Sequence, residues 1–474
     1  MFTIKNIATH ALCVCTTGLF VINSAFAGIP VEHWTQASGA QVYLVQSKAI
    51  PMVDVQLDFD AGSRRDPADQ AGLASVTAAM LSKGVRTGQS SAEPAMDENA
   101  LGEVWADLGA SFGAHATQDR MSFSLRSLTY PDLLPQVVQL AARQMAQPAF
   151  PADVWQRERD ALQASVRESN TRPATLAGRA FSQAVYGDHP YGYEMSEASL
   201  ARIDVSHMAA LHNQLVRACR AKVTVVGALN RTQADVLVTQ LLSRLPAPTG
   251  LPDRSTDTPA SSAVSPLSPH CAALPAVAEV QPLAQASEQR IAFESAQAHV
   301  LMGQPGFKRD DPDFFALTVG NYILGGGGFV SRLTHEVREK RGLSYSVSSY
   351  FSPALHAGAF TLGLQTRPDQ ADQALQVARE VLARFVADGP TELELQAAKG
   401  NLMGGFALRI DSNRKLLDNV ANIAWNQLPL TYLDTWTQEV AKVTASDIRG
   451  AFQRKLQAQK MAIVVLGGAA VAQK

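Results

Sequence analysis

Cysteine is scarce in this sequence, with four among 474 residues. Cys13 and Cys15 fall in a stretch that we expect to be removed, which leaves Cys219 and Cys271 in the rest of the chain. Two thiols are too few for a disulfide-rich scaffold or a four-cysteine zinc site, so both classes are excluded. The sequence leaves open whether these two pair, as an oxidising compartment would allow, or stay unrelated thiols.

An excess of positive charge is also lacking, because 41 Lys and Arg face 43 Asp and Glu, for a formal net charge of -2. Proteins that bind nucleic acid or anionic membranes need a concentrated basic surface. Beyond the N-terminal segment, no stretch approaches the ~20 continuous apolar residues of a membrane-spanning helix. We therefore expect no nucleic-acid partner and no membrane span.

The first 27 residues have the pattern of a secretory signal peptide. Lys5 gives a short basic start, residues 11–22 are mostly apolar, and residues 25–27 read A-F-A, an A-x-A cleavage signal. The apolar run is too short to cross a bilayer. The rest of the chain is expected to be secreted, and periplasmic if the source is Gram-negative.

The two sides of a Pro-rich segment resemble each other. Residues 246–282 contain eight of the 24 prolines, a composition typical of a linker. The stretch FSLRSLTYPDLLPQVVQL from Phe123 matches FTLGLQTRPDQADQALQV from Phe360 in pattern, each an alternating strand, a Pro-Asp turn and an amphipathic helix. Segments further on repeat at a similar spacing, which indicates a duplicated unit of about 200 residues.

This duplication predicts an α+β fold of two homologous domains, each a mixed or antiparallel β-sheet covered by helices. The expected boundaries are a signal peptide at 1–27, an N-terminal domain at 28–245, a linker at 246–290 and a C-terminal domain at 291–474.

Two short motifs are set aside. GASFG at 109–113 satisfies the G-x-S-x-G pattern of serine hydrolases, but a helical pattern precedes it and a strand follows, the reverse of a nucleophile elbow. GGGG at 325–328 lacks the Gly-Lys-Ser/Thr of a phosphate-binding loop, so we interpret it as a flexible loop leading into a helix.

One helical pattern has no reactive side chain where one is expected. In GLASVTAAMLSKG, bounded by Gly72 and Gly84, apolar residues recur at helical spacing, and the polar positions Ser75, Thr77 and Ser82 carry only hydroxyl groups. Elsewhere, none of the histidines beyond residue 27 forms an i, i+4 pair with another. A helical zinc site built from two histidines is therefore not predicted anywhere.

The segments Val53–Val85 and Leu317–Phe351 resemble the pitrilysin/insulinase family of zinc peptidases, and SRLTHEVREKRGLSYSV is the most specific part. In active members the first segment carries His-x-x-Glu-His, whose histidines hold zinc while the glutamate activates water. The resemblance places these roles on Ser75, Ala78 and Ala79, and a third ligand on Ala164 or Ser165. None of these positions holds the residue that its role requires, so no zinc is expected in this chain.

The same resemblance assigns a role to the C-terminal half. In this family that domain supplies an arginine and a tyrosine, seven residues apart, which bind the substrate and stabilise charge on the scissile carbonyl oxygen. These roles fall on Arg338 and Tyr345. We expect Val330, Leu333 and Val337 to bury one helix face, with a glycine ending the helix and the tyrosine entering a strand. A solvated arginine and a packing tyrosine remain the alternatives.

A further stretch, GASFGAHATQDRMSFSL, resembles the family's edge strand, to which substrate adds as an extra β-strand. Backbone groups of Ala114, His115, Ala116 and Thr117 would bind the peptide.

Three functions follow from the resemblance. The first is a non-catalytic, substrate-binding subunit of a two-chain peptidase that hydrolyses peptides. In that peptidase a homologous partner chain carries the zinc. The non-catalytic subunit is similar to the zinc-less subunit of mitochondrial processing peptidase. The second is a binding or scaffold protein without a catalytic partner. The third, an active peptidase by itself, is opposed by the missing ligands.

Overall fold

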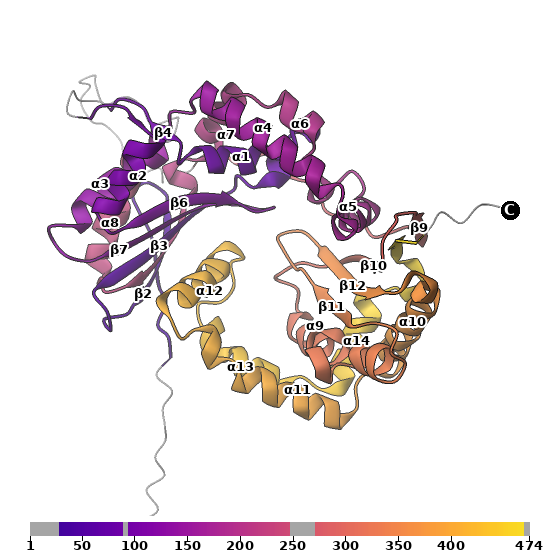
Figure 1. Cartoon of the computed structure of the whole chain (residues 1–474). Coiled ribbons are helices and arrows are strands. Elements are labelled where there is room, and N and C mark those ends of the chain that lie inside the picture. Colours follow the sequence, from indigo (N-terminus) through magenta and orange to yellow (C-terminus); the bar gives the residue numbers. More distant parts are fainter. Residues whose placement is uncertain (1–27, 89–92, 247–270, 469–474) are drawn as a thin grey trace, which may run out of the picture.

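The computed structural model describes residues 28–88, 93–246 and 271–468. It contains two halves, each with a β-sheet, and the sheets lie on opposite sides of the molecule (Figure 1). The predicted signal peptide and most of the Pro-rich segment lie outside the described residues. No helix in the described ranges is long and apolar enough to cross a membrane.

The N-terminal half has a six-stranded mixed sheet. Its strands, in spatial order, are β1 (Glu32–Thr35), β2 (Gln41–Gln46), β8 (Lys222–Gly227), β3 (Met52–Phe59), β7 (Met121–Leu128) and β6 (Ser111–Ala116). Only β2 and β8 run parallel; the other neighbours are antiparallel. A two-stranded hairpin, β4 (Gly84–Val85) and β5 (Met96–Asp97), lies beside this half.

The C-terminal half has a five-stranded sheet with the same plan. Its order is β9 (Ser287–Ile291), β13 (Ala462–Leu466), β10 (Ala298–Phe307), β12 (Gly358–Thr366) and β11 (Ser346–Phe351). Here too a single parallel pair, β9 and β13, lies near one edge. The sheets correspond strand for strand once β1 is set aside, which confirms the predicted duplication and fold class.

Helices cover the outer face of each sheet. In the N-terminal half they are α1 (Leu73–Met80), α2 (Glu98–Asp107), α3 (Leu134–Ala146), α4 (Ala152–Ser169), α6 (Glu197–Arg202), α7 (Val205–Leu215) and α8 (Arg231–Leu242). In the C-terminal half they are α9 (Phe314–Asn321), α10 (Ala371–Asp388), α11 (Glu392–Gly404), α13 (Tyr432–Lys442) and α14 (Ala445–Lys455).

The inner faces are covered by an exchange of helices between the halves. Helix α5 (Pro173–Tyr186) belongs to the N-terminal half but packs on β10 and β13, and α12 (Asn413–Trp425) belongs to the C-terminal half but packs on β3 and β8 (Figure 1). Both contacts are apolar. Phe181 of α5 lies over Gly303 of β10, where an added Cβ would come within 2.8 Å of the ring. Each half therefore completes the core of the other.

Polar contacts reinforce the exchange at the end of α12. Lys222 donates to the carbonyl oxygens of Ala424 and Trp425 at 3.1 and 3.0 Å, which satisfies groups that a helix C-terminus leaves unpaired. Beside them Arg120 pairs with the fully buried Asp58 at 3.0 Å. Burial raises the pKa of Asp58, and the positive charge of Arg120 opposes this shift.

Cys219 and Cys271 form a disulfide, with Cα atoms 5.7 Å apart, which settles the pairing that the sequence left open. The chain after Cys271 has no regular structure until β9, yet it is held to both halves. Arg65 donates to Pro275 O, and Glu279 pairs with Lys308 at 3.0 Å and accepts the Ala357 N–H at 3.0 Å. The last part of the predicted linker is therefore packed.

Candidate functional site

Helix α1 forms where the sequence predicts it, but ends at Met80; Gly84 begins β4 instead of closing the helix. Asp66 is buried and accepts the N–H groups of Gly72 and Ala74, both at 2.9 Å, at the start of this helix. Burial raises the pKa of Asp66 to about 7, although the backbone hydrogen bonds favour its charged form.

The residues at the family's metal positions do not fit zinc. Ser75 and Ala79 lie one turn apart on the accessible side of α1, whereas Ala78 is buried. Ala164 and Ser165 lie exposed on α4. Zinc in proteins is held by thiolate, imidazole and carboxylate groups, and these side chains carry none. Within the described ranges, no group of three or more His, Cys, Asp or Glu is placed to hold a metal ion.

Arg338 lies on a π-helix, Thr334–Glu339, and its side chain is half-buried. Leu333 and Val337 are buried as expected, but the predicted face is wrong at Val330, which is 75% exposed. Val330 ends a short 3-10 turn that precedes the helical segment, and the π-helix does not keep the α-helical period. The apolar spacing therefore does not extend back to this residue.

Arg338 differs from its charged neighbours in lacking an ion pair among the described residues. Glu336 binds Lys340 at 2.7 Å and Arg341 at 2.8 Å, and these partners, Lys340 first, lower its pKa to about 2. His335 is 2.8 Å from Glu339. The Arg338 guanidinium instead lies over the Phe329 ring, 4.7 Å from its centroid. Its hydrogen-bonding groups remain available for a ligand.

Tyr345 lies just before β11, not within it, which corrects the predicted strand position. Its side chain is 87% exposed, while Val347 and Ser349 are buried. Between the arginine and the tyrosine, Gly342 adopts φ +62° and donates its N–H to Arg338 O at 2.9 Å, so the helical segment ends at the predicted glycine. Both predicted side chains therefore flank one tight turn.

The predicted edge strand is confirmed as β6. It pairs with β7 on one side, with Ala114 opposite Phe123, His115 opposite Ser122 and Ala116 opposite Met121, and it has no strand on the other side among the described residues. Thr117 differs, because its N–H donates to Arg120 O and its carbonyl accepts from Ser63. The backbone of Thr117 is therefore committed to a turn.

Sequence reasoning missed the charged surroundings of His115. Arg414 and Asp418 of α12 act on its imidazole, together with Asp58 and Arg120 of the sheet. The stretch VDVQLDF in β3 alternates apolar and polar residues, and this alternation could have predicted that one face of the sheet is polar. No sequence pattern assigns α12 to this face. Within the described residues, β6 has no hydrogen bond or ion pair with Arg338 or Tyr345.

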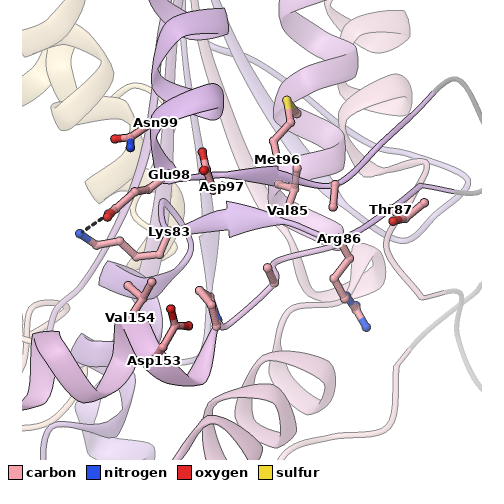
Figure 2. A pocket seen from close by; sticks show the side chains of 13 residues that line it. Lys83, Val85, Arg86, Thr87, Met96, Asp97, Glu98, Asn99, Asp153 and Val154 are labelled. Carbon is pink, nitrogen blue, oxygen red and sulfur yellow. Dashed lines mark hydrogen bonds and ion pairs between the residues drawn. The ribbon is translucent and has the colours of Figure 1, made fainter.

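A pocket of about 700 Å³ lies elsewhere, around the β4–β5 hairpin and the start of α4 (Figure 2). Lys83 at its edge pairs with Glu98 at 3.1 Å and with Glu158 at 2.9 Å. None of the predicted substrate-binding residues lines it. The chemistry predicted from the sequence therefore lies outside this pocket.

Both halves match known sequence families. The family described as Insulinase (Peptidase family M16) matches residues 41–199, and the Peptidase M16 inactive domain matches residues 202–402. A crystal structure of a peptidase M16 inactive domain from Pseudomonas fluorescens is 33% identical, with a TM-score of 0.82, and the match covers 94% of this chain and 99% of that one.

Two curated relatives are described as uncharacterized zinc proteases. The one from Mycobacterium leprae is 25% identical over 91% of each chain. The one from Streptomyces coelicolor is 35% identical over 37% of this chain, and the matched part spans only 38% of that protein. With matches along both halves and a relative at 33% identity covered almost end to end, the chain belongs to peptidase family M16, the insulinase family, as a homologue of its inactive type.

Proposed function

We propose that this chain is the substrate-binding, non-catalytic subunit of a secreted two-chain peptidase. A homologous partner would carry the zinc site, and this chain would supply Arg338 and Tyr345 to the peptide being cleaved. The observation that carries the proposal is the guanidinium of Arg338, which has no carboxylate partner in the described part of the chain while its charged neighbours are paired.

The chemistry of the two side chains suits a developing oxyanion. A guanidinium presents several N–H donors in a fixed plane, and a phenol adds one O–H donor. Donors that are already oriented stabilise negative charge on a carbonyl oxygen without reorganising during the reaction. Among the described residues Arg338 has no hydrogen-bond or ion-pair partner, and the Tyr345 side chain is exposed, so both are accessible to a substrate bound by another chain.

A binding protein without a catalytic partner is the second candidate, and it is favoured by the edge of β6 that no other described strand pairs with. Pairing of an extended peptide with a strand edge uses backbone groups and requires no reactive side chain. Ala114, His115 and Ala116 lie on that edge. This candidate leaves the unpaired arginine without a use, which is why the subunit function is preferred.

Affinity capture from the native source tests the proposal. The full chain, tagged at its C-terminus, is recovered from the secreted or periplasmic fraction, and co-purifying proteins are identified by mass spectrometry. We expect a homologue of similar length that contains His-x-x-Glu-His, and peptide hydrolysis that needs both chains. Recovery of homo-oligomers alone, or full activity from the partner alone, would contradict the proposal.

A further inference from the structure

An exposed aromatic ring lies against the arginine of the proposed site. Phe329 is 70% exposed, so it contributes little to the core. Its ring lies 4.7 Å from the Arg338 guanidinium carbon, within the range of cation–π attraction. In the described residues this ring is the contact that the structure gives to the charged end of Arg338. The ring is therefore placed to restrict the guanidinium.

The backbone that carries Phe329 is fixed in place. A Cβ at Gly325 would lie 2.4 Å from Ser349 Oγ, so the chain packs directly against β11 there. Gly328 adopts φ +63°, and the fully buried Ser331 donates its hydroxyl to the carbonyl oxygen of Gly328 at 2.8 Å. The glycine run, which the sequence suggested was a flexible loop, instead ends a π-helix, Tyr322–Gly326, and begins a 3-10 turn, Gly328–Val330, and this backbone holds Phe329 at a defined place.

The backbone of Arg338 is fixed as well, but its side chain is long. The N–H of Lys340 donates to His335 O at 3.0 Å in the π-helix, and Val337 is fully buried. An arginine side chain with no partner samples many rotamers, and ordering it costs entropy when a ligand binds. The Phe329 ring restricts this sampling before the ligand arrives.

We propose that Phe329 is a positioning residue, which holds the Arg338 guanidinium in the orientation that receives the substrate carbonyl. The inference rests on the proposed function, because it gives the ring a role in the same reaction. Preorganised donors are worth more than donors that must be ordered during the reaction. A cation–π contact at an exposed site corresponds to roughly a two- to fivefold effect on rate.

Kinetics of the reconstituted pair test this role through a double-mutant cycle. We expect Phe329→Leu, which keeps apolar bulk, to lower kcat by about two- to fivefold, and Phe329→Tyr to restore it. In an Arg338→Ala background, Phe329→Leu should have no further effect, because the ring acts through the arginine. The matched control is Val330→Ala, a neighbouring side chain that is 75% exposed. An equal loss in both backgrounds would mean that the ring contacts substrate itself and would overturn the inference.

A second measurement needs no partner. Side-chain NMR of the isolated chain should find the Arg338 protons shifted upfield by the ring current of Phe329, and Phe329→Leu should remove that shift. Unchanged Arg338 signals in the variant would overturn the inference whatever the kinetics. If Arg338→Ala leaves hydrolysis intact, the proposed function fails, while the NMR result still decides whether Phe329 orders the arginine.

Discussion

His189 and His356 come from opposite halves of the chain, and their rings meet edge to face with centroids 5.3 Å apart. Each ring uses a lone pair. His189 accepts the N–H of Tyr191 at 3.1 Å, and His356 Nε2 lies 3.4 Å from an Arg64 nitrogen, which can only donate. The His189 imidazole is therefore neutral in this arrangement, because a proton on its Nδ1 would replace the attraction to the Tyr191 N–H with a repulsion.

This contact predicts that acid weakens the junction between the halves. Burial lowers the pKa of His189 below its ordinary 6.5, and nearby His356 and Arg64 act in the same direction, against the Ala278 carbonyl and Glu279. The unfolded chain then binds more protons than the folded one below about pH 6.5, so stability falls with falling pH through that window. Glu279, whose pKa is lowered to about 2, stays charged there.

The free energy of unfolding should be measured by urea titration from pH 8 to pH 5. We expect His189→Gln to lose less stability over that range than the unmodified chain does. His335→Gln is the control, because His335 is exposed and pairs within its own helical segment. Variants must be compared because other groups also make stability depend on pH. Burial lowers the pKa of His212, which makes acid destabilising as for His189, whereas the raised pKa of Asp66 makes acid stabilising. Parallel pH profiles for His189→Gln and the unmodified chain would refute the prediction.

A second prediction concerns catalysis by the reconstituted pair. Arg338→Ala or Tyr345→Phe should each lower peptide hydrolysis by ~10²–10³, the usual cost of losing one oriented donor at an oxyanion. The two losses should be strongly non-additive if both side chains serve one transition state. Lys340→Ala, which removes an exposed ion pair with Glu336, should be nearly silent. Full activity in the Arg338→Ala, Tyr345→Phe double variant would shift the preference to the binding-protein function.

A third prediction concerns metal content. Because Ser75, Ala78, Ala79 and the exposed Ala164 and Ser165 offer no zinc ligands, the isolated chain should hold no stoichiometric zinc. Elemental analysis after dialysis against a weak chelator measures this directly. About one zinc per chain would show that ligands exist outside the positions identified by the family resemblance.

A further prediction concerns limited proteolysis and rests on the disulfide. The Pro-rich composition of residues 246–282 predicts tolerance to cleavage, and the packed residues after Cys271 confine the expected cuts to 247–270. Such a cut falls inside the loop closed by Cys219 and Cys271. Limited proteolysis should therefore give one band on a non-reducing gel and two after reduction. Two bands without reductant would place the cut outside the loop or show that the pair is not formed.

Because the halves exchange helices, we expect the stability of each half to depend on the other. Phe181 is 7% exposed and packs on the C-terminal sheet, although it belongs to the N-terminal half. Phe181→Ala should cost ~3 kcal/mol, as for other large aromatic truncations in cores. Calorimetry should find a single unfolding transition at a lower temperature. The exposed Val236→Ala is the control. Loss of the C-terminal transition alone, with the N-terminal half unchanged, would mean that the halves unfold independently.

The sequence predicted the duplicated sheets because strand alternation and helix periodicity are local properties, as in the stretches from Phe123 and Phe360. It could not predict the exchange of α5 and α12. An apolar stripe shows that a helix is buried, but not which sheet covers it. Pairing of Cys219 with Cys271 was likewise open, because the pairing depends on how the chain returns across 52 residues.

At the candidate site, the sequence proposed the residues, but it did not predict their local geometry. The resemblance located Arg338 and Tyr345, but spacing alone placed Val330 on a buried face and Tyr345 inside a strand. A 3-10 turn and a π-helix occupy this stretch, and both depart from the regular period on which such predictions depend. The contact between Phe329 and Arg338 arises from that irregular geometry.

The helix exchange also sets the order in which the molecule can be completed. The last strand of the N-terminal sheet to be synthesised, β8, ends at Gly227, yet the helix that covers its inner face ends only at Trp425. During synthesis from the N-terminus, the inner face of that sheet stays uncovered until almost the whole chain is present. Domains that fold as independent units do not have this delay. The exchange therefore predicts that the chain folds as a single unit, despite the internal repeat from which it is built.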